Sequence, residues 1–211
     1  MIDDTLVQRS LFGGAMQLHF PLRLVDISDF RPVPDHQEVF ADASLDQSLV
    51  VEIVVSMSSQ QIYRAVVQEH QPVPDAEAAS FFFHDQAANN EAQHAQIDMQ
   101  YVLSQQDVPD LPPDCFKAIL VGQQAVTKGR QGSDALNKVH IILCCIRLPQ
   151  HGSDLLLTLN SPIYISEKSA AAEHAGAGFK GAHLTAPALF KQIISSLRIN
   201  DWGLFGDRPG A

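Results

Sequence analysis

Four carboxylates and one arginine lie close together between residues 25 and 40, a stretch named here the acidic segment. It reads VDISDFRPVPDHQEVF, and its charged residues are Asp26, Asp29, Arg31, Asp35 and Glu38. Pro32 and Pro34 fix their own φ, lack an amide hydrogen and disfavour the helical conformation at the residue before each of them. We therefore expect a stiff, exposed loop rather than a helix. Such a loop suits docking to a positively charged protein surface, because little conformational freedom is lost on binding.

The residue types of the acidic segment are compatible with three kinds of chemistry. A cluster of carboxylates can be a solvated surface, or it can bind a basic partner. It can also hold two carboxylates in one cleft with displaced pKa values, as acid–base enzymes do. Residue types alone leave all three interpretations open.

Other chemical motifs are absent from the sequence. There are nine histidines and three cysteines, but no CxxC, HExxH or GxSxG pattern. No phosphate-binding glycine motif follows Gly13-Gly14, and His140 lies in an apolar run, as a histidine of the core does. We therefore predict no metal, no cofactor and no catalytic residue, and we interpret the cysteines as reduced core thiols in the cytosol or nucleus.

Length and charge restrict the class of protein. The chain has 211 residues, of which 45% are hydrophobic, and this predicts a single domain over residues 1–211. Its formal net charge of −10 argues against nucleic acid and anionic membranes as partners. No apolar run reaches the roughly 18 residues of a membrane span, and the first residues do not resemble a signal peptide. We expect a soluble, untargeted protein with no membrane insertion.

Apolar patterning predicts the elements that must position the acidic segment. We expect a first strand over residues 11–20 with a bulge at Gly13-Gly14, and further strands over residues 49–55, 118–121, 139–146 and 155–159. One helix is predicted from Asp75, as its N-terminal cap, toward Ala88, and another after Pro187, through Leu197. Residues 62–67 are compatible with a helix or a strand, and we favour a helix.

The connection between two of these strands indicates the fold class. Only the sequence LPQHGS, residues 148–153, separates the runs at 139–146 and 155–159, which is too short for a crossover helix. The two strands should be antiparallel neighbours. We predict an α+β fold with a largely antiparallel sheet of about six strands, covered by helices on both faces. Residues 166–181 are predicted to form a flexible low-complexity loop, and the aromatic tail at Trp202 is expected to pack back on the body.

The acidic segment and its flanks also resemble a known family. LFGGA at residues 11–15, the acidic segment and QSLVVE at residues 47–52, in this order, are similar to the Ran guanine nucleotide release factor family, the Mog proteins. A weaker likeness continues through residues 146–148, Asp154 and Asn160 to residues 204–206, so it covers nearly the whole chain. His36 departs from the family pattern, and residues 57–74 form a longer segment than is usual.

The resemblance implies a function for the acidic segment. Members of this family bind the nuclear transport GTPase Ran, promote loss of its guanine nucleotide, and share a fold with the PsbP proteins. Their VPDxQE motif places the two residues implicated in GTPase contact at Asp35 and Glu38. The same Ran-binding patch would include Asp26, Asp29, Arg31, Pro34 and Gln37.

The resemblance thus predicts a regulator that acts by binding and is not an enzyme. It implies a monomer in the nucleus and cytoplasm that takes part in nucleocytoplasmic protein transport. The alternative is an adaptor or scaffold whose acidic loop docks a basic protein without affecting nucleotide exchange.

Overall fold

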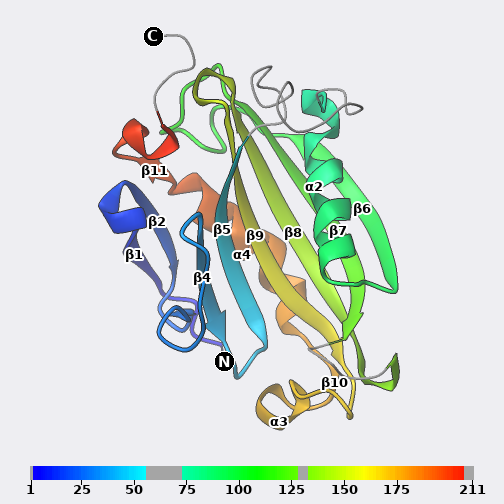
Figure 1. Cartoon of the computed structure of the whole chain (residues 1–211). Helices are drawn as coiled ribbons and strands as arrows, with labels where there is room; N and C mark the ends of the chain where they lie inside the picture. Colours follow the sequence, from blue (N-terminus) through cyan, green and yellow to red (C-terminus); the bar gives the residue numbers. More distant parts are fainter. Residues whose placement is uncertain (1, 56–72, 128–132, 207–211) are drawn as a thin grey trace.

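The computed structural model describes residues 2–55, 73–127 and 133–206, which form two β-sheets with helices packed against them (Figure 1). The strands are β1 (Leu6–Leu11), β2 (Met16–Pro21), β3 (Val25–Asp26), β4 (Gln37–Asp42), β5 (Gln47–Val55), β6 (His94–Val102), β7 (Phe116–Thr127), β8 (Leu136–Leu148), β9 (Ser153–Ile165), β10 (Gly178–Phe179) and β11 (Arg198–Ile199). The helices are α2 (Asp75–Asn89), α3 (Ala172–Ala175) and α4 (Ala182–Ser195). The 3-10 turns are η1 (Phe12–Gly14), η2 (Ser133–Ala135), η3 (Pro149–His151) and η4 (Trp202–Phe205). No helix in these three ranges is long and apolar enough to cross a membrane.

The large sheet has eight strands in the order β3-β4-β5-β9-β8-β7-β6, with β10 paired to the end of β9. β8 and β9 pair antiparallel from Leu148 opposite Ser153 to Lys138 opposite Tyr164. This confirms the predicted antiparallel pairing across the short connection. The expected α+β class is also confirmed. The expected count of about six strands was too low, because β3 and β10 have only two residues each and are too short to be recognised from apolar patterning.

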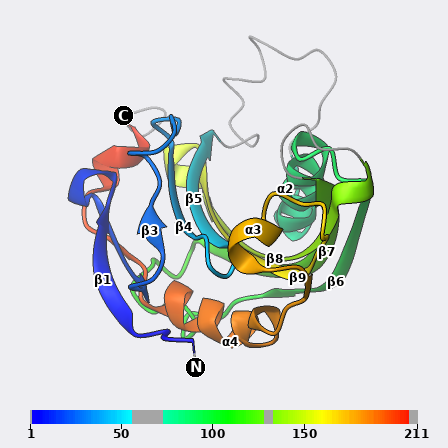
Figure 2. The same ribbon diagram turned by 90° about the horizontal axis from the view of Figure 1, so that it is seen from below.

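The centre of the large sheet is buried on both faces. Along β8, alternate side chains enter two separate hydrophobic clusters. One cluster lies on the α4 side and includes Ile142, Cys144 and Ile146. The other lies on the α2 side and includes Ile141, Leu143 and Cys145. Figure 2 shows α2 and α4 on these opposite faces, as predicted, although the small sheet shares the α4 face.

Phe83 of helix α2 packs against β7 at Gly122. A Cβ atom added at Gly122 of β7 would lie 2.8 Å from carbons of the Phe83 ring and 2.6 Å from the Gln96 carbonyl oxygen. Only glycine leaves room for the aromatic ring here. The helix bounds agree with the prediction, but Asp75 is its first residue and not its cap. The Asp75 carboxylate instead lies 3.1 Å from Nη1 of Arg147.

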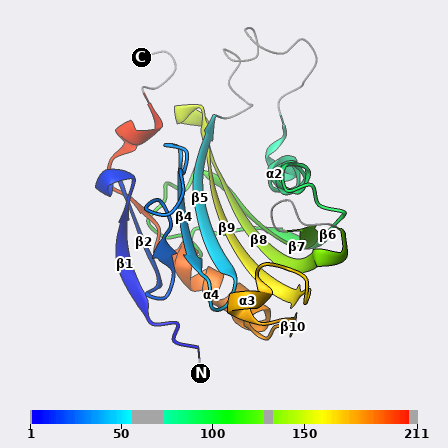
Figure 3. The same ribbon diagram turned by 60° about the horizontal axis from the view of Figure 1, so that its bottom comes forward.

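The small sheet has the order β1-β2-β11 and lies beside the β3–β4 edge of the large sheet (Figure 3). The expected single strand with a bulge at Gly13-Gly14 was wrong, because these glycines form the turn of a hairpin between β1 and β2. Phe12, Gly13 and Gly14 have φ values of 49°, 65° and 97°. Three successive residues with positive φ reverse the chain, and glycine at two of them limits the steric cost.

The C-terminal third of the chain contains the remaining differences between the predicted and the observed elements. Helix α4 begins at Ala182, so Pro187 lies inside it and does not precede it. Residues 166–181 contain α3 and β10, and the Asn137 amide contacts Ser169 Oγ at 2.8 Å in this region. The predicted packing of the tail is confirmed, since Phe205 is buried in the core. The helix expected over residues 62–67 lies outside the described residues.

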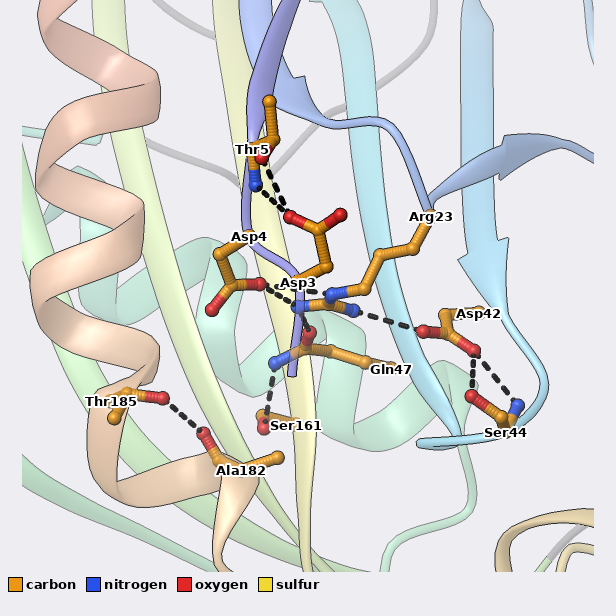
Figure 4. Close-up of polar contacts among 10 residues, drawn as sticks. All are labelled: Asp3, Asp4, Thr5, Arg23, Asp42, Ser44, Gln47, Ser161, Ala182 and Thr185. Atoms are coloured by element: carbon orange, nitrogen blue, oxygen red, sulfur yellow. Dashed lines mark hydrogen bonds and ion pairs between the residues drawn. The ribbon is translucent and has the colours of Figure 1, made fainter. Parts of the chain in front are cut away.

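Arg23 links the N-terminal segment, the β4–β5 turn and β9 in a polar network (Figure 4). Its guanidinium lies 2.7 Å from the Asp4 carboxylate and 3.2 Å from Asp42, and it donates a hydrogen bond of 2.6 Å to Gln47 Oε1. Gln47 in turn donates to Ser161 Oγ on β9 at 3.0 Å. Burial acts to raise the pKa of Asp42, but hydrogen bonds from Ser44 and the charge of Arg23 outweigh it and lower this pKa.

We predict that Arg23→Met lowers the free energy of unfolding by about 3 kcal/mol, because it leaves the nearly buried Asp42 and Gln47 without their partner. The matched control is Arg198→Met, whose partner Asp110 lies at 2.7 Å but is solvent-exposed with it. This control should cost at most about 0.5 kcal/mol. Urea denaturation measures both values, and equal losses would contradict a structural role for Arg23.

His140 is half-buried between β8 and the first turn of α4, with its ring 6.3 Å from the His183 ring. Burial lowers the pKa of His140, and the nearby His183 ring adds to this effect. A hydrogen bond to the His183 backbone and the charge of Asp98 oppose it. The folded protein therefore takes up the proton on His140 at a lower pH than the unfolded chain does.

We predict that stability falls as the pH is lowered below the ordinary histidine pKa of about 6.5, because the unfolded chain binds more protons there. His140→Gln should flatten this dependence between pH 7 and pH 5. His94→Gln, at an exposed position of β6, should leave it unchanged. Unfolding free energies measured at several pH values test the prediction, and an unaltered slope in His140→Gln would refute it.

Candidate functional site

The acidic segment lies at one edge of the large sheet, where it forms β3, the connection to β4 and the first four residues of β4. All seven residues predicted for the binding patch belong to this one connection and its flanking strands. Those with exposed side chains are Asp26, Asp29, Arg31, Pro34 and Asp35. Gln37 and Glu38 are partly buried at the start of β4. The predicted exposed loop is therefore present, but its two ends differ in accessibility.

Backbone hydrogen bonds hold both ends of the connection. The Ile27 amide donates to the Val39 carbonyl at 3.1 Å, and the Gln37 amide donates to the Pro34 carbonyl at 2.8 Å. The Ile53 amide of β5 donates to the His36 carbonyl at 2.9 Å, which extends the ladder beyond Gln37. Asp35 thus lies between two anchored residues, and its exposed carboxylate is presented from an ordered backbone.

Glu38 has a structural contact that the sequence did not reveal. Its Oε1 accepts a hydrogen bond of 2.5 Å from the backbone amide of Phe12, in the turn between β1 and β2. Burial raises the pKa of Glu38, the hydrogen bond from Phe12 lowers it, and the negative charge of Asp26 raises it, with a net increase. Glu38 therefore ties the small sheet to β4 as well as adding charge to the patch.

Glu52 of β5 is a further carboxylate at this site. It lies opposite Gln37 in the β4–β5 register and accepts a hydrogen bond of 2.7 Å from the Gln37 side-chain amide. Its carboxylate also lies 3.6 Å from Nε2 of His36. Sequence reasoning gave Glu52 no role, although it is the single charge in an otherwise apolar strand, LVVEIVV. That isolated charge was the feature of the sequence that could have indicated a site residue.

Metal binding and nucleophilic chemistry are the other uses that the side chains could have. Among the described residues, no group of three or more His, Cys, Asp and Glu side chains is placed to hold a metal ion. A cavity of about 330 Å³ lies at the β8–β9 turn, and Cys115 and Trp202 are among its lining residues. Burial raises the pKa of the Cys115 thiol, which makes it a weak nucleophile. The acidic segment is best suited to electrostatic binding of a basic surface.

Comparisons with known proteins show which family the chain resembles. Residues 9–162 match the family described as Ran-interacting Mog1 protein. The chain is 35% identical over 202 residues to the Ran guanine nucleotide release factor of Danio rerio, covering 95% of this chain and 100% of the relative. It is 25% identical over 156 residues to the nuclear import protein mog1 of Schizosaccharomyces pombe, covering 72% and 75%. The solved structure of the Saccharomyces cerevisiae Ran-binding protein Mog1p aligns with a TM-score of 0.63 at 19% identity over 96% of this chain and 100% of that chain, and shows the shared fold.

We predict that Glu38→Ala and Glu38→Gln have different effects on stability. The alanine leaves the Phe12 amide without its acceptor, which should lower the free energy of unfolding by about 1–2 kcal/mol. The glutamine retains a side-chain oxygen for this amide and removes a half-buried charge, so its stability should stay within about 0.5 kcal/mol of the wild type. Chemical denaturation of both variants provides the measurement. If both were equally destabilised, the ionised carboxylate itself would be required.

Proposed function

The chain belongs to the Ran-interacting Mog1 protein family, and from this premise we propose that it binds the GTPase Ran through its acidic segment and promotes release of guanine nucleotide. It is a homologue of Ran guanine nucleotide release factors, which regulate by binding and are not enzymes. The observation that carries the proposal is the exposed Asp35 carboxylate on a backbone anchored on both sides.

The chemistry of nucleotide binding suggests how the acidic segment acts. Small GTPases hold the nucleotide phosphates with a P-loop lysine, backbone amides and Mg²⁺. These are cationic or hydrogen-bond-donating groups, and an external carboxylate competes with phosphate for them. In the proposed mechanism Asp35 approaches such groups directly. Glu38 supports Asp35 by fixing the start of β4 against the small sheet and adds negative charge beside Asp26.

The remaining predicted residues have secondary roles in this proposal. Asp26 and Asp29 extend the negative surface, and Arg31 contributes an exposed charge of the opposite sign. Pro34 restricts the backbone next to Asp35, and its carbonyl accepts the hydrogen bond from the Gln37 amide. We further propose that the protein acts as a monomer in the nucleus and cytoplasm, in nuclear transport. The similarity to the nuclear import protein mog1 of Schizosaccharomyces pombe supports that role.

One observation favours the adaptor as a second candidate. The Glu38 carboxylate already accepts a hydrogen bond within the protein, so the number of carboxylates free to enter a nucleotide site is smaller than the motif suggests. An acidic surface that docks on Ran without displacing nucleotide needs only the exposed aspartates. In the release mechanism, bound nucleotide weakens the binding of this protein to Ran. In the adaptor mechanism it does not.

A nucleotide-release assay with purified Ran tests the proposal. We predict that the wild-type protein accelerates release of a fluorescent guanine nucleotide, and that Asp35→Asn weakens Ran binding more than tenfold, which corresponds to about 1.4 kcal/mol or more. The control is Glu173→Gln on α3, an exposed carboxylate at the opposite end of the large sheet. It should behave as the wild type, and an equal loss in this control would indicate that overall charge, not the site, drives binding.

Affinities for nucleotide-free and nucleotide-loaded Ran separate release factor from adaptor. A protein that ejects nucleotide must bind nucleotide-free Ran more tightly than nucleotide-loaded Ran. Linkage requires that the protein weaken nucleotide binding by the same factor by which nucleotide weakens the binding of the protein. A typical coupling corresponds to about 5- to 150-fold. Equal affinities would support the adaptor and remove the release mechanism.

A further inference from the structure

Phe30, at the tip of the acidic segment, has a large apolar side chain that is 83% exposed. It lies between the exposed charges of Asp29 and Arg31. None of the ring contacts found among the described residues involves Phe30. A phenylalanine ring in water gains free energy when a partner covers it, because apolar surface is removed from solvent. The charges of the acidic segment do not explain why this ring is exposed.

Local hydrogen bonds fix the backbone of the turn that carries Phe30. The amides of Phe30 and Arg31 both donate to the Ile27 carbonyl, at 3.0 and 3.1 Å. The Ser28 amide donates to the Asp26 carboxylate at 2.8 Å. The turn is thus closed by its own backbone before any partner arrives. A side chain presented from an ordered turn loses little backbone freedom on docking.

Another phenylalanine on the surface provides a comparison. Phe179 of β10 is 84% exposed, but its ring packs edge-on against Tyr164 at 5.2 Å between centroids. It belongs to β10, which pairs with β9 and not with β3 or β4. Phe179 therefore has a contact within the protein, whereas Phe30 combines exposure, an ordered turn and neighbouring carboxylates. Aromatic anchors surrounded by polar residues are the usual energetic centres of protein interfaces.

We propose that Phe30 is the apolar anchor of the Ran-binding surface, and that its ring enters an apolar depression on the GTPase while the surrounding carboxylates face basic groups. This inference rests on the proposed function and adds to it a division of roles. The aspartates steer the encounter and set its rate, because charges act over long range. Phe30 holds the complex together once formed, so it controls the dissociation rate.

The test is the binding of Ran, with known nucleotide state, to immobilised full-length protein carrying Phe30→Ala, Phe30→Leu or Phe179→Ala. Phe30→Ala should weaken binding about 30-fold, equivalent to about 2 kcal/mol, through faster dissociation. Its association rate and the dependence of that rate on salt should stay as in the wild type, because no charge is removed. Phe30→Leu retains an apolar side chain and should restore affinity to within about threefold. Phe179→Ala should bind as the wild type.

The outcomes distinguish this inference from the function on which it rests. Wild-type protein that binds Ran, together with a Phe30→Ala variant that dissociates at the wild-type rate, overturns the anchor and leaves the proposed function intact. Equal losses in Phe30→Ala and Phe179→Ala also overturn it, because they indicate nonspecific apolar adhesion. Wild-type protein that fails to bind Ran overturns both. Melting temperatures of the three variants should match the wild type, which excludes misfolding as a cause of lost binding.

Discussion

The burial of both faces of the β8–β9 pair is the constraint on which the rest of the structure depends. Strands whose side chains are apolar on both faces must be covered twice, and a sheet so covered needs elements from distant parts of the chain. Helix α2 covers one face, and α4 together with the small sheet covers the other. The N-terminal hairpin therefore lies against the large sheet, and this places the acidic segment at the edge between the two sheets.

The position of the acidic segment explains why Glu38 has two roles. In β4 the first two residues, Gln37 and Glu38, are partly buried, and the next two are buried. Glu38 turns inward to accept the Phe12 amide of the small sheet, whereas Asp35 precedes the strand and stays in water. The inward carboxylate has a raised pKa because it is partly desolvated. One short motif thereby joins the two sheets and carries the proposed binding surface.

Charge and apolar surface are divided within the proposed interface. The chain has a net charge of −10, and the exposed aspartates concentrate part of this charge beside the ordered turn that presents Phe30. Long-range attraction brings a basic partner to the edge where Asp35 contacts it, but exposed charges outside that contact contribute little lasting affinity in physiological salt. A single exposed aromatic ring can supply that affinity. The two contributions are physically separate, so they are also separable by mutation.

The sequence by itself determined the fold class, the antiparallel pairing of β8 and β9, and the location of the acidic segment. These follow from local signals: apolar runs, a short connection and two prolines that exclude a helix. Only the tertiary structure decided that Gly13-Gly14 is a hairpin turn, that Glu38 faces Phe12 and that Glu52 lies opposite Gln37. The Glu38–Phe12 contact joins two sheets and depends on packing of the whole core, whereas the other two features depend on how strands adjacent in the chain pair and in which register. The exposure of Phe30 also appears only in the tertiary structure. A phenylalanine in a sequence is expected to be buried, but the elements around Phe30 leave its side chain in solvent.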